Sequence, residues 1–170
     1  MTIGVVVPTL GIRGEFLLQC LNSIRSSARD TEIVIVCPEF SVIEEFRARG
    51  LCDLWEIDPG RGLGHAINLG MRKLDGKVEF ATWLGDDDFL DTGALDTLAQ
   101  ELSSSKASFA FSGCRYVDES NQTLWTNRSG TWALKILAIG PDLIPQPASV
   151  FSLSDFWAVG GIDESLGWAF

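Results

Sequence analysis

The sequence predicts an α/β domain with a mostly parallel sheet flanked by helices, and a small mixed β region in its C-terminal half. Two observations support this fold class. Continuous apolar runs over residues 3–7 and 32–37 are typical of buried parallel strands. Between and after these runs, apolar residues recur at helical spacing, so strands and helices alternate. Such an alternation implies a parallel sheet with right-handed crossovers.

The first half of the chain accounts for the parallel part of the sheet. Helical spacing predicts a helix over residues 15–26. A Ser-x-x-Glu capping box that begins at Ser41 predicts a second helix, which ends at Gly50. Residues 54–57 are predicted to form a third, shorter strand, and residues 78–84 a fourth.

The second half is more mixed. It is expected to contain, in order, a helix through Leu95, Leu98, Ala99 and Leu102, a strand over 108–112, a β-hairpin or meander of 115–118 and 123–126, a short helix over 132–139, a strand over 148–153 and a short helix over 154–159. We expect one domain over residues 1–170.

Composition limits the classes of function. The chain has 170 residues, of which 46% are hydrophobic, so general disorder is excluded. A formal net charge of −10 argues against a nucleic-acid partner. The four cysteines form no CxxC pair, so we expect no zinc site, and Cys20 and Cys37 are expected to be buried thiols. We find no signal peptide and no membrane-spanning run, and we expect a cytoplasmic protein, with peripheral membrane contact left open.

The fourth strand ends in three successive carboxylates, Asp86, Asp87 and Asp88, which we call the acidic triplet. A carboxylate is costly to bury, so these side chains must reach water, a cation or a ligand. Carboxylate oxygens suit Mg²⁺ and Mn²⁺, and ligands of open α/β sheets bind at the carboxyl ends of strands. We therefore expect a metal and phosphate site. The alternative is a solvated loop or a helix cap, because residues 91–95 look like a helix start.

A glycine-rich loop follows the third strand. Gly60, Gly62 and Gly64 force an irregular path, and the next helix presents free backbone N–H groups that can receive a phosphate. The spacing matches neither the dinucleotide fingerprint nor a P-loop, so an ordinary strand-to-helix turn is the alternative.

Segments along nearly the whole chain resemble the glycosyltransferase family 2 proteins of the GT-A fold. These segments are residues 5–9, 32–36, 64–70, 83–90 with a DxD-like signature, 93–95, 145–151 and 159–164. The resemblance implies transfer of a sugar from a UDP- or GDP-sugar donor to a hydroxyl acceptor, with inversion and with Mn²⁺ or Mg²⁺ as the divalent cation. The acceptor hydroxyl would belong to a saccharide, a lipid-linked molecule or a protein.

The resemblance also implies a nucleotide-sugar-binding half over residues 1–91 and a partial acceptor-side half over residues 92–170. It assigns roles at the donor side. Asp88 would ligate the metal directly, and Asp86 directly or through water. Asp87 would hydrogen-bond the ribose or a metal-bound water. Pro8 and Thr9 would lie beside the nucleoside, mostly through backbone contacts.

At other positions the residue differs from the family pattern, or its role has two possible interpretations. Pro38 and Glu39 stand where the family often has two aspartates, so Glu39 is the candidate that contacts the base. Arg61 lies near the phosphates or is a solvated loop cation. Asn68 is expected to brace the loop, and His65 to be structural or solvent-facing.

Inverting transfer needs a general base for the acceptor hydroxyl. In similar proteins this carboxylate lies just after the Gly-Gly-x-Asp-Glu stretch. We expect it beyond Phe170, in a longer natural protein, with Asp163 or Glu164 as the alternatives.

Rival functions remain at this point. One is a nucleotide-sugar-binding module that is non-catalytic or truncated, in which exposed Trp157, Trp168 and Phe170 promote a homo-oligomer. Another is an Asp-x-Asp phosphohydrolase, although such enzymes usually place the motif on their first strand. A sugar-phosphate nucleotidyltransferase would need a glycine-rich, basic loop after strand one, of which residues 8–13 are a weak version.

Overall fold

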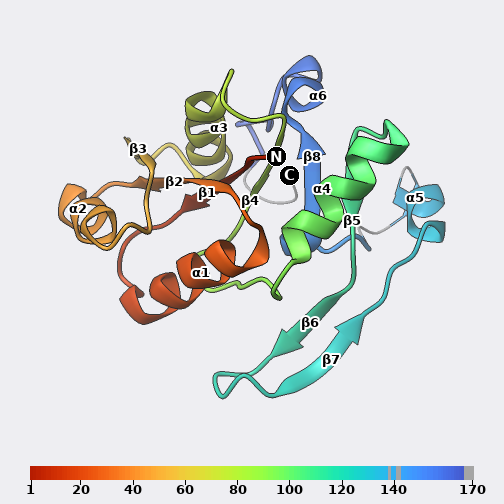
Figure 1. Ribbon diagram of the computed structural model, residues 1–170, viewed down its shortest axis with the longest axis horizontal. Coiled ribbons are helices and arrows are strands. Elements are labelled where there is room, and N and C mark those ends of the chain that lie inside the picture. The colour runs from red at the N-terminus through yellow and green to blue at the C-terminus, as the bar shows by residue number, and fades with distance from the viewer. Residues whose placement is uncertain (138, 141–142, 167–170) are drawn as a thin grey trace.

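The computed structural model describes residues 1–137, 139–140 and 143–166. Within these residues, a six-stranded sheet has the order β3-β2-β1-β4-β8-β5 (Figure 1). Its strands are β1 (Ile3–Pro8), β2 (Thr31–Cys37), β3 (Leu54–Ile57), β4 (Phe80–Trp83), β5 (Phe109–Phe111) and β8 (Ser149–Ser152). Strands β1 to β4 are parallel, whereas β8 is antiparallel to both β4 and β5. The predicted α/β class with a mostly parallel sheet is confirmed.

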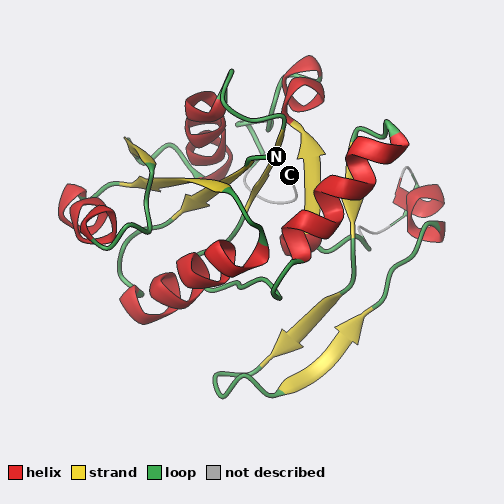
Figure 2. Ribbon diagram, viewed as in Figure 1, coloured by secondary structure: helices red, strands yellow, loops and turns green. Residues whose placement is uncertain are grey.

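Helices cover both faces of the sheet, as Figure 2 shows. Their bounds are α1 (Gly14–Ser27), α2 (Phe40–Ala48), α3 (Leu63–Leu74), α4 (Ala94–Ser105) and α6 (Leu153–Ala158). Alternate strand residues point to opposite faces. In β1, Val5 and Val7 pack with α1, α2 and α4, whereas Val6 packs with α3 and α6. Two separate hydrophobic clusters therefore hold the helices on the sheet.

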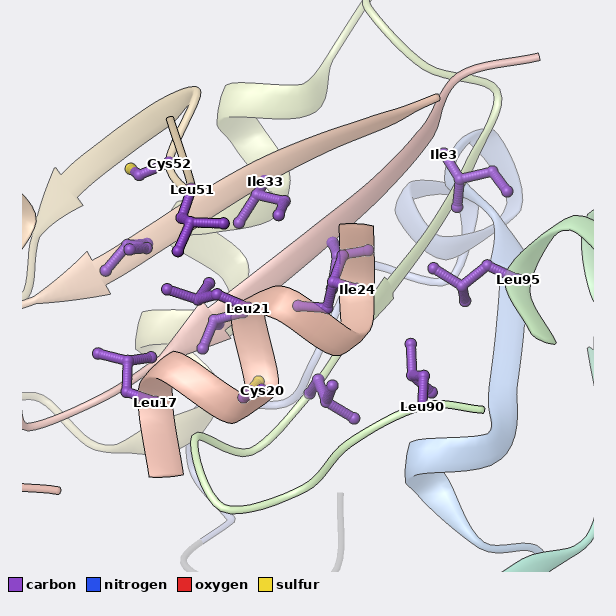
Figure 3. Packing of buried hydrophobic residues seen from close by; sticks show 14 of the residues in the cluster. Ile3, Leu17, Cys20, Leu21, Ile24, Ile33, Leu51, Cys52, Leu90 and Leu95 are labelled. Carbon is purple, nitrogen blue, oxygen red and sulfur yellow. The ribbon is translucent and has the colours of Figure 1, made fainter. Parts of the chain in front are cut away.

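The larger cluster lies under α1. Leu17, Leu21 and Ile24 recur at helical spacing and are fully buried, and Figure 3 shows them beside the strands that carry Ile3 and Ile33. Burial of a large aliphatic side chain contributes about 1.5–3 kcal/mol. The buried apolar stripe thus holds α1 against the sheet. It also positions the loop that connects β1 to α1.

On the other face, α3 lies very close to β1. A Cβ atom on Gly70 would be 2.3 Å from Cγ1 of Val6, so only glycine permits this approach. His65, Asn68 and Ile67 of α3 are buried as well. This close packing positions the start of α3 at the carboxyl ends of the parallel strands.

A two-stranded antiparallel hairpin, β6 (Cys114–Val117) and β7 (Thr123–Asn127), extends away from the sheet (Figure 1). The rings of Tyr116 and Trp125 are cross-strand neighbours and stack with their centroids 4.2 Å apart. The predicted hairpin is confirmed. It is followed by the short helix α5 (Trp132–Leu137).

Two local expectations were wrong. Ser41 does not cap α2, because the helix already begins at Phe40 and Glu39 holds the N-cap position without a side-chain cap bond. Trp157 is not an exposed side chain, because it packs partly buried on the α3 side and its indole N–H donates to Asp75 Oδ1 at 2.7 Å. Trp168 and Phe170, named with it above, lie outside the described residues.

Cys20 and Cys37 are buried free thiols, as predicted. Within the residues that the structure describes, no helix is both long enough and apolar enough to cross a membrane.

Candidate functional site

The acidic triplet lies just beyond β4, at the carboxyl edge of the parallel strands. The N–H of Asp88 donates to the carbonyl of Gly85 at 3.1 Å and closes a tight turn. The next helix, α4, has Gly93 as its N-cap, so the triplet does not cap that helix. The alternative of a helix cap is therefore wrong.

Asp86 is buried, with only 4% of its surface exposed. Its two oxygens accept from two different side chains: Oδ2 from the hydroxyl of Thr9 and Oδ1 from Nη2 of Arg13. The Thr9 oxygen itself accepts from the N–H of Gly11 at 2.9 Å, which leaves its own proton for Asp86. Charge-assisted bonds of this kind compensate a carboxylate that has lost water.

Arg13 connects two members of the triplet. Its Nη1 donates to Oδ2 of Asp87 at 2.5 Å, while Nη2 contacts Asp86. The side chains of Arg13 and Asp87 are about half exposed, at 46% and 49%. Sequence reasoning missed this partner of the triplet. Its position in the loop after the first strand, at the same edge of the sheet, was the signal that could have identified it.

Asp88 has a different environment. Its pKa is raised to about 6, mainly by burial and then by the negative charges of Asp87 and Asp86. A hydrogen bond from the Gly85 backbone and the positive charge of Arg13 lower this pKa and offset part of the rise. Under the turn, the thiol of Cys20 donates to the Gly85 carbonyl at 3.5 Å. Burial and the triplet also raise the pKa of this thiol, so it remains protonated. The triplet is thus a site of concentrated negative charge.

The members of the triplet line two pockets. The first, about 450 Å³, is lined by Pro8, Thr9, Arg13 and Asp86, and also by the glycine loop and the start of α3 through Gly60, Gly62, Leu63 and Ala66. The second, about 560 Å³, is lined by Asp87, Asp88 and the hairpin residues Cys114, Arg115, Tyr116 and Val117. Across it, Arg115 pairs with Asp91 at 2.6 Å.

Three of the predicted donor-side residues, Pro8, Thr9 and Asp86, meet in the first pocket. Arg61 and Glu39 are exposed and are not among its lining residues. Asp58 lines this pocket instead, directly after β3, and sequence reasoning did not single it out.

The late segment also reaches this edge of the sheet. Nε2 of Gln146 donates to the carbonyl of Trp83 at 2.6 Å, at the end of β4. Its neighbour Pro147 lines the second pocket. A turn that is remote in sequence therefore completes the wall beside the triplet.

Asp163 and Glu164 are engaged in local hydrogen bonds. Asp163 Oδ1 accepts from the N–H and hydroxyl of Ser165. Glu164 forms hydrogen bonds with His65 and Asn68. Both bonds lower the pKa of Glu164, and the bond from Asn68 has the larger effect. Neither carboxylate lines either pocket.

The carboxylates of the triplet suit a divalent ion whose remaining ligands come from a substrate. In the part of the chain that the structure describes, no group of three or more His, Cys, Asp or Glu side chains is arranged to hold a metal ion. Mg²⁺ and Mn²⁺ accept one or two carboxylates together with substrate phosphates. Asp88, with Asp86 next to it, offers such a donor set.

No protein-family model and no curated protein matches the chain. Solved structures do. S. aureus TarS 1–349 in complex with UDP has a TM-score of 0.70 and 15% identity over 99% of this chain and 52% of that chain. The mannosyltransferase PcManGT of Pyrobaculum calidifontis in complex with GDP-Man and Mn²⁺ has a TM-score of 0.66 and 14% identity over 97% and 48%.

A 4-diphosphocytidyl-2C-methyl-D-erythritol synthase from Anaerococcus prevotii DSM 20548 is also similar, with a TM-score of 0.60 and 12% identity over 92% of this chain and 72% of that chain. The chain spans about half the length of the TarS 1–349 and PcManGT chains that it matches. At these identities the likeness concerns the fold. The chain has a GT-A-like fold, as the resemblance implied.

Proposed function

We propose that this chain is the donor-binding part of an inverting glycosyltransferase that moves a sugar from a nucleotide diphosphate to a hydroxyl acceptor. The observation that carries this proposal is the place of the acidic triplet, which follows β4 at its carboxyl end and contributes lining residues to both pockets. Ligands of open α/β sheets bind at this edge. A reaction that joins a donor to an acceptor needs two adjoining spaces with the charged group between them.

The first pocket is proposed to hold the nucleotide. Pro8, the last residue of β1, and Thr9 line it, and Asp58 supplies a carboxylate that can accept from N–H groups of the base. The diphosphate would lie toward the triplet and toward the start of α3, where the N-cap residue Gly62 has no side chain that could accept from the first backbone N–H groups. Glu39 and Arg61 stay proposed donor contacts from exposed positions.

Asp88 and Asp86 are proposed to hold the divalent cation, Mn²⁺ or Mg²⁺, with Asp87 oriented by Arg13 toward the ribose or a metal-bound water. When bound, the cation supplies positive charge where the leaving diphosphate becomes more negative. The presence of Mn²⁺ with GDP-Man in PcManGT supports this choice of ion. Because the pKa of Asp88 is about 6, its carboxylate is mostly ionised at neutral pH and available as a ligand.

The second pocket is proposed to receive the acceptor hydroxyl, which would belong to a saccharide, a lipid-linked molecule or a protein. Its wall from the hairpin combines Tyr116 with polar groups. A lowered pKa makes Glu164 a weak base for this hydroxyl. In this proposal Glu164 holds the segment after α6 in place, and the base is a different carboxylate.

Calorimetric titration with UDP and GDP, each with and without Mn²⁺, tests the donor site. We expect binding of one nucleotide to require the metal, and Asp88→Asn to weaken it at least about tenfold, which equals about 1.4 kcal/mol. Asp155→Asn, on the exposed start of α6, is the matched control and should bind like the wild type. Metal-independent binding that Asp88→Asn leaves unchanged would contradict the proposal.

A nucleotidyltransferase is the second candidate, because the synthase from Anaerococcus prevotii shares the fold and Arg13 lies on the loop after β1. Incubation with a nucleoside triphosphate and a sugar phosphate would then release pyrophosphate. Incubation with a nucleotide sugar and an acceptor would instead release the nucleoside diphosphate. Binding without either release would favour the non-catalytic binding module, and phosphatase activity without nucleotide binding would favour the phosphohydrolase.

A further inference from the structure

Arg13 binds the acidic triplet from the side of the first pocket. It lines this pocket together with Leu10 and Ile12 of the same loop, and it contacts Asp86 and Asp87 through its two terminal nitrogens. A guanidinium that spans two separate carboxylates neutralises one of their charges without any metal. Arg13 therefore acts as an internal counter-ion of the site where the cation is proposed to bind.

Both oxygens of Asp86 are already used. Oδ2 accepts from Thr9 and Oδ1 accepts from Arg13. Thr9 is neutral and short, and its hydroxyl is oriented by Gly11, so this contact is compatible with a nearby cation. Arg13 is permanently charged and repels a second cation on the same carboxylate. A divalent ion that uses Asp86 must therefore compete with Arg13 and not with Thr9.

We propose that Arg13 and the divalent cation exchange at Asp86, and that the displaced guanidinium then binds the diphosphate of the donor in the first pocket. This inference rests on the function proposed above and names a positioning residue for it. A guanidinium forms bidentate, charge-assisted bonds to phosphate, so the diphosphate offers Arg13 a partner as good as the one it leaves.

The surroundings of Arg13 permit such a movement. The side chains of Arg13 and Asp87 are both half exposed, so their ion pair contributes only about 0–1 kcal/mol. The side chain of Asp86 is only 5% exposed, so the cation must replace the guanidinium there and not leave this carboxylate without a positive partner. Asp86 keeps its bond to Thr9 when Arg13 leaves. Because Arg13 already lines the first pocket, its guanidinium needs only a change of side-chain rotamer to face a ligand there.

The exchange predicts opposite effects of one substitution. Arg13→Gln removes the competitor, so Mn²⁺ alone should bind more tightly. The same variant lacks the phosphate contact, so UDP or GDP should bind more weakly at saturating Mn²⁺. A residue that only stabilised the loop would weaken both interactions.

Mn²⁺ affinity is measured by electron paramagnetic resonance of the free ion, without nucleotide, and nucleotide affinity by calorimetry at saturating Mn²⁺. We expect Arg13→Gln to raise the first and to lower the second by about fivefold or more each. Arg13→Lys keeps the charge and should restore part of the nucleotide affinity. Arg49→Gln is the matched control, because Arg49 pairs with Glu45 on α2 and carries the same charge; it should change neither affinity more than about twofold.

A measurement on the wild type avoids any effect of the variants on folding. The side-chain Nε–H resonance of Arg13 should shift when Mg²⁺ and the nucleotide are added together, while that of Arg49 stays in place. Mn²⁺ affinity that is equal or lower in Arg13→Gln, with metal-dependent nucleotide binding intact, would overturn the exchange and leave the proposed function standing. A wild type that binds neither UDP nor GDP with Mn²⁺ would overturn the proposed function and the exchange with it.

Discussion

The Nδ1 atom of His65 on α3 lies 2.7 Å from Oε2 of Glu164 in the segment after α6. One turn further along α3, Asn68 donates to Oε1 of Glu164 and to the carbonyl of Ile162, each at 2.9 Å, and accepts from the N–H of Ile162 at 3.0 Å. Both α3 residues are buried. These bonds attach the late segment to the helix whose first turn lines the first pocket.

Asn68→Ala should therefore destabilise the protein. Asn68 is 3% exposed, and its loss leaves the N–H of Ile162 and one oxygen of Glu164 without their partner, which costs about 1–3 kcal/mol. Urea unfolding followed by circular dichroism measures the change. Asn22→Ala on the exposed face of α1 is the control and should stay within about 0.5 kcal/mol. Equal midpoints for the two variants would show that these bonds contribute little.

Gly70→Ala should be destabilising because of its contact with β1. The added methyl group would meet Val6 Cγ1 at 2.3 Å and Val36 Cγ2 at 3.1 Å, and overpacking of this kind costs about 1–3 kcal/mol. Gly14→Ala, at the start of α1 with no atom within 4 Å, is the matched change and should be neutral or slightly stabilising. Thermal unfolding of both variants measures the difference, and a Gly70→Ala protein as stable as Gly14→Ala would contradict the packing described here.

Gly11→Ala should affect stability and nucleotide binding together. Gly11 has a φ of +75°, and a Cβ atom there would lie 2.8 Å from Val42 Cγ2, so the loop that holds Thr9 must shift. We expect a loss of about 1–2 kcal/mol in stability and weaker nucleotide binding. Gly50→Ala shares the positive φ of +70° but meets no atom within 4 Å. This control should lose stability through backbone strain and keep its nucleotide affinity, and a parallel loss of affinity in both variants would refute a local role of Gly11.

Asp88→Asn should make the protein more stable at neutral pH. The pKa of Asp88 rises from 3.8 to about 6 on folding, so the folded state binds the proton more tightly and loses stability as the pH rises through this window. Above pH 6 the ionised side chain costs of the order of 1–3 kcal/mol, which the amide removes. Below about pH 4 both proteins carry a neutral group and should be equally stable.

Urea unfolding at pH 7.5 and at about pH 4 measures this pH dependence for Asp88→Asn. Asp87→Asn is the comparison, because it removes a neighbouring carboxylate that pairs with Arg13, and it should not be stabilising. A wild type that is more stable than Asp88→Asn at pH 7.5 would show that the raised pKa has no energetic consequence.

Much of the sheet could be predicted from local pattern. Continuous apolar runs predicted β1 and β2 as buried strands, and apolar residues at helical spacing predicted α1 as an amphipathic helix. In the structure, the bounds of these three elements lie within two residues of the expected bounds. The hairpin of β6 and β7 was predicted in the same way. The position of β8 was not, because a strand pattern shows which side chains are buried but not that the strand enters antiparallel between β4 and β5.

The candidate site, too, could be predicted only in part from the sequence. By itself the sequence determined that three adjacent carboxylates follow a buried strand, since the pattern of apolar and charged residues is local. Only the tertiary structure decided that Arg13, 73 residues before Asp86, neutralises part of this charge, and that Asp86 is buried while Asp87 is not. The physical reason is that ion pairs and desolvation depend on which loops meet at the edge of the sheet, and that meeting is set by strand order and helix packing.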